Sequence, residues 1–318
     1  MRRRRRALAE VDLSTDLGGL TLANPIVAAS GTFGHGDEVA ASCDPRGLGA
    51  VTVKSLAPYP WPGNDGLRVT EAPGGGMLNA IGLPGPGVDA WIEHDLPALE
   101  ARGARIIVSV WGRTVEEFAR AVAPLRAHAD RLLAIEVNVS CPNLEDRAHM
   151  FSHSLDATNA ATRAVVAELA GALPVFVKLS PNVTDIREIA GAALDGGATG
   201  LTLINTVMGL VVDADTRRPK LDAGGGGLSG PPIAPVALRA VHDVTRAYPA
   251  TPVIGTGGVS TGAGAVAMLL AGASAVGVGT ATFVEPRATL RVARELGRWC
   301  AEHGVARVRD LVGALEGP

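Results

Sequence analysis

The chain has 318 residues, of which 47% are hydrophobic and only 3% aromatic, and its formal net charge is −3 at pH 7. This balance argues against nucleic acid or an anionic membrane as partner, and no apolar run reaches the roughly 18 residues of a transmembrane helix. The three cysteines, Cys43, Cys141 and Cys300, are too few and too widely spaced for a disulfide framework, a thiolate metal site or an iron–sulfur cluster. A reduced, cytoplasmic protein is expected.

The one strongly basic segment lies at the N-terminus. Residues Arg2–Arg6 are followed by Ala7–Gly18, which is interrupted by acidic residues and lacks the apolar core of a signal peptide. We expect residues 1–18 to be a disordered tail and residues 19–318 to form one folded domain.

Short apolar runs alternate with longer helical patterns along the rest of the chain. The runs are continuous rather than alternating, as expected for parallel strands covered on both faces. The predicted strands are Pro25–Ala29, Ala50–Val53, Arg105–Val110, Leu133–Asn138, Val175–Leu179, Gly200–Ile204, Pro252–Gly255 and Ala275–Val278. The clearest predicted helices are Val115–His128, Leu155–Ala172, Asp185–Asp195, Pro235–Ala247, Gly262–Ala271 and Pro286–His303.

Eight strands in this alternation predict a single closed (β/α)8 barrel, with an open doubly wound sheet as the alternative. Polar or glycine-rich residues follow nearly every strand at its C-terminal end, where barrel enzymes build their sites. An open dinucleotide-binding sheet would concentrate glycines after its first strand. That strand ends here in Ala29-Ser30-Gly31-Thr32, which is not GxGxxG, so the barrel is favoured.

Two long segments interrupt the alternation. Leu56–Gly87 is rich in proline and glycine, holds no convincing helix, and could include a small hairpin near Leu67–Glu71. Met208–Pro232 is similar and contains four consecutive glycines at Gly224–Gly227. Loops this long inside a compact domain are usually functional.

The strongest local signal follows the fourth strand, in Glu136-Val-Asn-Val-Ser-Cys141-Pro-Asn143. A cysteine in this position would lie in a loop over the barrel mouth, among polar neighbours. A thiol acts as a base or nucleophile only as its thiolate, which a polar or cationic setting favours. We expect Cys43 and Cys300 to be small buried hydrophobic residues.

Further polar residues stand at other strand ends. The side chain of Asn79, in the stretch Met77–Leu83, has both a donor and an acceptor and can hydrogen-bond to an amide or imide group of a ligand. Lys54 and Lys178 each end an apolar strand, which suggests an anionic ligand or an electron-rich ring. Ile204-Asn205-Thr206 brings another amide and hydroxyl to the presumed mouth.

Glycines follow the seventh and eighth strands, in Gly255-Thr-Gly257-Gly258 and Gly277-Val-Gly279-Thr280. Loops at these two places commonly bind phosphate in barrel enzymes, because backbone N–H groups and a helix N-terminus favour an anion. The segment Ser229-Gly230-Pro231-Pro232 could add a third wall. The pattern indicates a phosphate-bearing cofactor.

Taken together, these segments resemble the dihydroorotate dehydrogenase family from Asn24 to about Pro286. The matching motifs are Asn24-Pro25, Ala29–Gly34, Met77–Leu83, Asn138–Asn143, Val177–Asn182, Ile204–Thr206, Gly227–Pro231 and Gly257-Gly258. The resemblance implies oxidation of dihydroorotate to orotate in pyrimidine biosynthesis, with Cys141 removing a proton from C5 and the hydride at C6 passing to N5 of FMN.

The resemblance also implies a role for each matching residue. The substrate set would be Lys54, Asn79, Ala80, Ile81, Gly82, Leu83, Asn138, Asn143, Asn205 and Thr206. The flavin set would be Ser30, Lys54, Ser55, Ser109, Asn138, Lys178 and Ile204. The phosphate and ribityl cradle would be Gly230, Gly257, Gly258, Gly279 and Thr280.

The cysteine base and the absence of a hydrophobic extension resemble the soluble members of the family rather than the membrane-associated ones. Among the soluble members, the sequence of these motifs is most similar to the NAD-linked branch. That branch pairs a homodimeric FMN core with a subunit that carries FAD and a 2Fe–2S cluster. The fumarate-using homodimeric branch remains open as an alternative.

Three departures from the family pattern stand out. Ser109 occupies a flavin-side position that is often Asn, Gly226 replaces a common Thr, and the loop Leu144–His153 lacks the glycines of its relatives. Two other functions therefore remain alternatives. One is reduction of uracil-like pyrimidines, against which Asn143 argues because those relatives carry histidine there, and the other is a flavin-binding barrel without catalysis.

Overall fold

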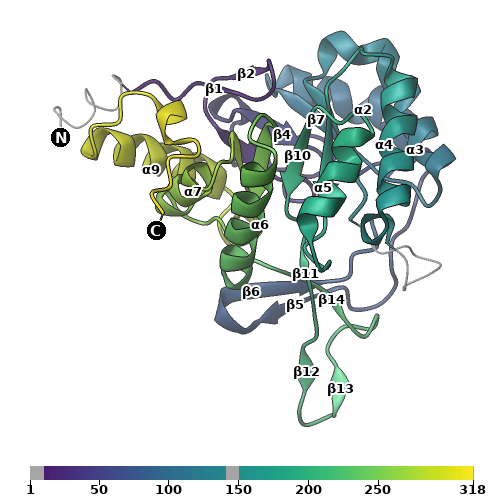
Figure 1. The fold of residues 1–318 in the computed structure, drawn as a ribbon. Coiled ribbons are helices and arrows are strands. Elements are labelled where there is room, and N and C mark those ends of the chain that lie inside the picture. The colour runs from purple at the N-terminus through teal and green to yellow at the C-terminus, as the bar shows by residue number, and fades with distance from the viewer. Residues whose placement is uncertain (1–10, 141–149, 318) are drawn as a thin grey trace.

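The computed structural model describes residues 11–140 and 150–317. Its centre is a barrel of eight parallel strands, closed in the order β10-β15-β16-β3-β4-β7-β8-β9 (Figure 1). The bounds are β3 Ile26–Ala28, β4 Ala50–Thr52, β7 Ile106–Val110, β8 Ala134–Asn138, β9 Val175–Leu179, β10 Gly200–Leu203, β15 Val253–Thr256 and β16 Ala275–Val278. The predicted (β/α)8 barrel is confirmed, and the open sheet is excluded by the β10–β15 and β16–β3 pairings.

The side chains of the barrel strands alternate between two cores. Val27, Ile107 and Phe176 belong to a small interior cluster, whereas their neighbours in sequence belong to the larger core between strands and helices. Because the period of a strand is two, Ser109 and Lys178 must face the same interior, one step closer to the C-terminal end. The barrel therefore has an apolar bottom and a polar top.

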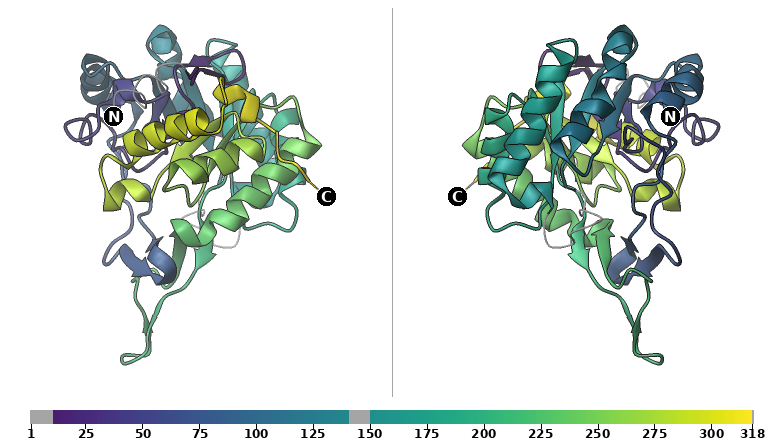
Figure 2. Two further views of the ribbon diagram at one scale, coloured as in Figure 1. Left: turned by 90° about the vertical axis from the view of Figure 1, so that its left-hand side faces the viewer. Right: turned by 90° about the vertical axis from the view of Figure 1, so that its right-hand side faces the viewer.

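Helices cover the outside of the barrel (Figure 2). They are α2 Val88–Ala101, α3 Val115–Val122, α4 Leu155–Leu169, α5 Ile186–Asp195, α6 Ala234–Ala247, α7 Gly262–Leu270, α8 Ala281–Val284 and α9 Ala288–Glu302. Helix α2 is absent from the predicted set, because Pro97 lies inside it and breaks its pattern. Helix α3 is shorter than predicted, since Pro124 opens a 3₁₀ segment that runs to Arg131.

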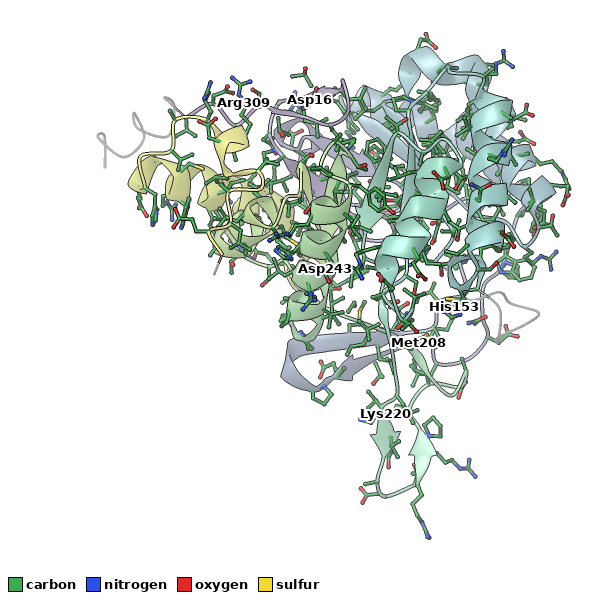
Figure 3. The ribbon with its side chains drawn as sticks, viewed as in Figure 1. Asp16, His153, Met208, Lys220, Asp243 and Arg309 are labelled. Carbon is green, nitrogen blue, oxygen red and sulfur yellow. The ribbon has the colours of Figure 1, made fainter. Side chains whose placement is uncertain are left out.

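A second sheet lies beyond the C-terminal ends of the barrel strands, in the order β11-β14-β6-β5 (Figure 1). Its strands are β5 Val69–Ala72, β6 Gly76–Asn79, β11 Val207–Gly209 and β14 Gly226–Ser229. The hairpin expected near Leu67–Glu71 is thus present as β5 paired with β6. Strands β12 Val212–Asp213 and β13 Arg218–Pro219 pair in a ribbon that projects farther (Figures 2 and 3).

The opposite end of the barrel is closed by the N-terminal segment. Strand β1 Thr15–Asp16 pairs with β2 Thr21–Leu22, and Leu17 and Leu22 are fully buried within the interior cluster. Residues 11–18, which the sequence assigned to a disordered tail, therefore belong to the fold. Apolar side chains at 17 and 22 carry this segment into the barrel, since burying them removes apolar surface from water.

Within residues 11–140 and 150–317, no helix combines the length and the apolar character that crossing a membrane requires.

Candidate active site

The polar top of the barrel interior holds a buried ion pair. Lys178 Nζ lies 4.0 Å from Glu136 Oε1, and the two residues are only 7% and 2% exposed. Ser109 Oγ donates a hydrogen bond of 3.0 Å to the same carboxylate oxygen. Buried charges are tolerated when they are paired and hydrogen-bonded. Ser109, Glu136 and Lys178 lie on β7, β8 and β9, so three neighbouring strands place this ion pair beneath the barrel mouth.

A chain of hydrogen bonds runs from this pair toward the mouth. Ser55 Oγ lies 2.9 Å from Ser109 Oγ and accepts a bond of 3.1 Å from Asn138 Nδ2. Ser140 Oγ donates to Asn138 Oδ1 at 2.9 Å and accepts from Asn205 Nδ2 at 2.6 Å. The side-chain amides of Asn138 and Asn205 are therefore held in fixed orientations, each with atoms at the cavity surface.

One cavity of about 1060 Å³ between the barrel mouth and the second sheet is lined by Ser55, Asn138, Ser140, Lys178 and Asn205. It collects most of the predicted site, namely Ser30, Lys54, Ser55, Asn79, Ala80, Ile81, Gly82, Leu83, Asn138, Lys178, Ile204, Asn205, Thr206, Gly230, Gly257, Gly258, Gly279 and Thr280. Ser109 is buried beneath the cavity and does not line it. Cys141 and Asn143 lie outside the described residues.

The loop after β6 presents backbone amides to the cavity. Gly82 and Leu83 have left-handed backbone angles, with φ of +76° and +57°. The carbonyls of Ala80, Ile81 and Gly82 all accept hydrogen bonds from the segment 61–64. Because C=O and the following N–H point in opposite directions across a trans peptide, the amides of residues 81, 82 and 83 face away from that segment. We call these three N–H groups the lid amides.

The lid amides donate to no other residue in the described part of the chain. All three of their residues line the cavity, and Lys54 lines it as well, with its Nζ close to Gly31. Successive N–H groups in left-handed turns form concave anion sites. The loop thus provides backbone donors for an anion at the cavity wall, and Lys54 adds a cation to the lining of the same cavity.

The far end of the cavity is built from glycines packed against the start of α6. A Cβ on Gly258 would lie 2.6 Å from Ala234 Cβ, and one on Gly257 would lie 2.6 Å from Ala237 Cβ. Only glycine allows this approach, and both residues have positive φ. The backbone here can approach a ligand closely at a helix N-terminus, where a phosphate is favoured.

Two residues that line the cavity, Thr256 and Asn182, and the buried Glu136 were not given roles from the sequence. Thr256 Oγ1 is buried and has no hydrogen-bond partner among the described residues. Asn182 donates to Thr206 O at 3.0 Å and accepts from Met208 N at 2.8 Å, which fixes the start of β11. Glu136 could have been found from the alternation of β8, because its side chain shares the interior face with Asn138.

The other two cysteines are structural, as expected. Cys43 and Cys300 are fully buried, and burial raises the pKa of both thiols. Neither lines the cavity.

The sequence is similar to those of known proteins. The family model for dihydroorotate dehydrogenase matches residues 12–299, which span every barrel strand and the whole cavity lining. The chain belongs to the dihydroorotate dehydrogenase family. The family resemblance of the sequence motifs is thereby confirmed.

Members of the dihydroorotate dehydrogenase family match nearly the full length. The dihydroorotate dehydrogenase B (NAD(+)), catalytic subunit, of Geobacter sulfurreducens is 45% identical over 305 residues, covering 96% of this chain and 98% of the relative. The protein of the same name from Alkaliphilus metalliredigens is 43% identical over 308 residues, covering 97% and 100%. A putative dihydroorotate dehydrogenase A (fumarate) of Solibacter usitatus is 45% identical over 304 residues, covering 96% and 98%.

One departure from the dihydroorotate dehydrogenase pattern has a structural reason. A Cβ on Gly226 would lie 2.4 Å from the carbonyl oxygen of Asn79. Threonine, common at this position, would therefore require β14 and β6 to separate. Gly226 instead lets the two strands pack closely over the cavity.

Proposed function

We propose that this chain oxidises (S)-dihydroorotate to orotate in pyrimidine biosynthesis, with FMN as the resident electron acceptor and Cys141 as the base. The observation that carries the proposal is the continuity of one cavity, which joins the asparagines and lid amides at one end to the glycine cradle at the other. A flat pyrimidine and a flavin need such adjacent sites if a hydride is to pass between them.

The residues present fit FMN. Gly257 and Gly258 let the backbone after β15 pack directly against the start of α6, and Thr256 offers a buried hydroxyl without a partner in the described chain. We assign the phosphate to this end, with Gly230, Gly279 and Thr280, and the ring to the end near Ser30, Ser55, Lys178 and Ile204. FMN bound there would supply the two-electron acceptor for the hydride at C6 of dihydroorotate.

The chain's own groups complement dihydroorotate. Its carboxylate would bind the lid amides and Lys54, since charge-assisted hydrogen bonds are the strong ones. Its imide has both donors and acceptors, which match the amides of Asn79, Asn138 and Asn205. These asparagines are anchored by neighbours, so they bind the substrate in one orientation.

Cys141 would remove the proton at C5. The residue before it, Ser140, is held from both sides by Asn138 and Asn205. The residue directly before the proposed base is therefore anchored at the cavity wall. A nearby cation such as Lys54 would favour the thiolate and so its action as a base. Asn143 is proposed to join the substrate set.

We propose that the electrons pass on to NAD through a second subunit that carries FAD and a 2Fe–2S cluster, in a cytoplasmic assembly around a homodimeric core. Two of the relatives described above are named as catalytic subunits of NAD-linked enzymes, and the three cysteines of this chain fall short of a cluster's four ligands. The fumarate-linked alternative rests on the Solibacter relative, which is equally similar.

Anaerobic titration of the purified yellow protein tests this function. Dihydroorotate should bleach the flavin, whereas dihydrouracil should leave the spectrum unchanged. Bleaching by dihydrouracil alone would instead support a dihydropyrimidine enzyme, and no bleaching by either would support a flavin-binding protein without catalysis. Full-rate fumarate reduction by the isolated chain, without NAD reduction in the presence of any partner, would contradict the NAD-linked branch.

A further inference from the structure

The lid amides are oriented by a segment that lies outside the predicted substrate set. Asn64 Nδ2 donates 2.9 Å to the carbonyl of Ala80, and the backbone N–H of Asn64 donates 3.1 Å to Ile81. Trp61 Nε1 donates 2.9 Å to the carbonyl of Gly82. Three consecutive carbonyls are thus fixed by two residues, which determines where the three following N–H groups point.

The indole ring of Trp61 is itself clamped. The guanidinium carbon of Arg113 lies 5.3 Å from the centre of the Trp61 ring and 5.6 Å from that of Tyr59. Trp111 packs edge-on against Trp61 with ring centres 6.1 Å apart, and Tyr59 does so at 6.3 Å. This cluster uses two of the four tryptophans and one of the two tyrosines in a chain that is poor in aromatic residues.

The cluster around Trp61 connects the loop that carries the lid amides to strand β7 and helix α3 of the barrel. Trp111 and Arg113 directly follow β7, and Glu117 lies in the first turn of α3. Glu117 Oε2 accepts hydrogen bonds from Tyr59 Oη at 2.9 Å and from Arg113 N at 2.7 Å. Trp61 also forms two backbone hydrogen bonds with Gly85, just after the lid amides in sequence, both 2.9 Å.

We propose that Trp61 and Asn64 are positioning residues that aim the lid amides at the carboxylate of the substrate. This inference rests on the proposed function, because the carboxylate is that of dihydroorotate or orotate. Without these two donors, the peptide planes of Ala80–Leu83 can rotate, and the three N–H groups no longer converge. Asn64 stands at the cavity edge, but its amide nitrogen is committed to Ala80.

Orotate binding to the FMN-loaded protein, followed by the change in the flavin spectrum, tests the role of each donor. Trp61→Phe keeps a ring in the clamp and removes the N–H, and Asn64→Ala removes the amide. Each should raise the dissociation constant for orotate by about five- to tenfold, as expected for the loss of one ordered hydrogen bond. The KM for dihydroorotate should rise equally, while kcat stays within about twofold, because the carboxylate is bound alike before and during reaction.

Matched controls separate positioning from general loosening. Trp299→Phe alters a tryptophan that stacks on His303 outside the cavity, and Asn159→Ala removes a side-chain bond of 3.0 Å to the carbonyl of Ala192. Both should bind orotate as the wild type does. FMN affinity should stay unchanged in all four variants, whereas a merely structural role would weaken FMN and orotate binding together.

The proposal is overturned if both variants bind orotate within about twofold of the wild type, or if FMN affinity falls in parallel with orotate affinity. Should Trp61→Phe fail to fold, the result for Asn64→Ala decides. A wild-type protein that binds FMN but no orotate would overturn the proposed function and this inference with it. A wild type that binds orotate, beside variants that do so equally well, overturns only the inference.

Discussion

The ammonium nitrogen of Lys178 lies 4.0 Å from a carboxylate oxygen of Glu136, with both side chains almost fully buried inside the barrel. Glu136 lies on β8 opposite Phe176, and Lys178 lies on the adjacent strand β9 opposite Asn138. Ser109 completes the group with a hydrogen bond to Glu136. Lys178 lines the cavity to which we assign the flavin ring, and Glu136 is buried behind it.

Replacing Glu136 by glutamine should destabilise the protein strongly. The substitution keeps the shape but leaves Lys178 as an uncompensated buried charge, which costs about 3–5 kcal/mol. Urea unfolding of Glu136→Gln should show this loss, while the exposed control Glu302→Gln should stay within about 0.5 kcal/mol of the wild type. The double variant Glu136→Gln/Lys178→Met should lose less than the two single variants added together. Equal unfolding midpoints for Glu136→Gln and the wild type would contradict the pairing.

The barrel strands could be predicted to within one residue at each end, because continuous apolar runs such as Val175–Leu179 have one interpretation in an alternating pattern. Helix α2 could not, since Pro97 interrupts it. Residues 11–18 were misassigned because strands of two residues, such as Thr15–Asp16, carry no periodic signal.

The candidate site likewise has residues that the sequence could predict and contacts that it could not. Residues within recognisable motifs, such as Asn79 and Gly258, could be predicted and do line the cavity. The contacts between Glu136 and Lys178 or between Trp61 and Gly82 could not, because they depend on strand register and on how two distant loops pack. Their residue types, a glutamate in a strand and a tryptophan in a loop, have many other uses.

A methyl group at Gly258 should disrupt the cofactor site. The added Cβ would lie 2.6 Å from Ala234, whereas a Cβ on Gly171 would meet nothing within 4 Å. Both glycines have positive φ, +73° and +81°, so the backbone strain of about 1 kcal/mol is common to both alanine variants. Gly258→Ala should lose a further 1–3 kcal/mol, roughly the cost of overpacking, and most of its FMN on purification. Equal FMN content in Gly258→Ala and Gly171→Ala would contradict the cradle.

Acidification should destabilise the protein partly through His35. Burial lowers the pKa of this imidazole, Glu38 opposes the effect, and Lys54 adds to it. The unfolded chain therefore binds the proton at higher pH than the folded protein. This contribution to stability is present above the unfolded pKa of about 6.5 and is lost as the pH falls below that value.

Urea unfolding between pH 7.5 and 5.5 measures this dependence. His35→Gln should lose less stability over the interval than the wild type does, because glutamine does not titrate. His94→Gln, at an exposed position, should follow the wild type. A pH dependence for His35→Gln as steep as that of the wild type would rule out the histidine as its source.

The proposed chemistry depends on a thiolate and a flavin meeting one substrate in one cavity, and single-turnover flavin reduction under anaerobic conditions measures this most directly. Wild-type protein mixed with dihydroorotate should bleach in a single turnover, and Cys141→Ala should retain FMN but bleach at least about a hundredfold more slowly, as expected for loss of a general base. Flavin that stays oxidised in the wild type, or that bleaches equally fast in Cys141→Ala, would contradict it.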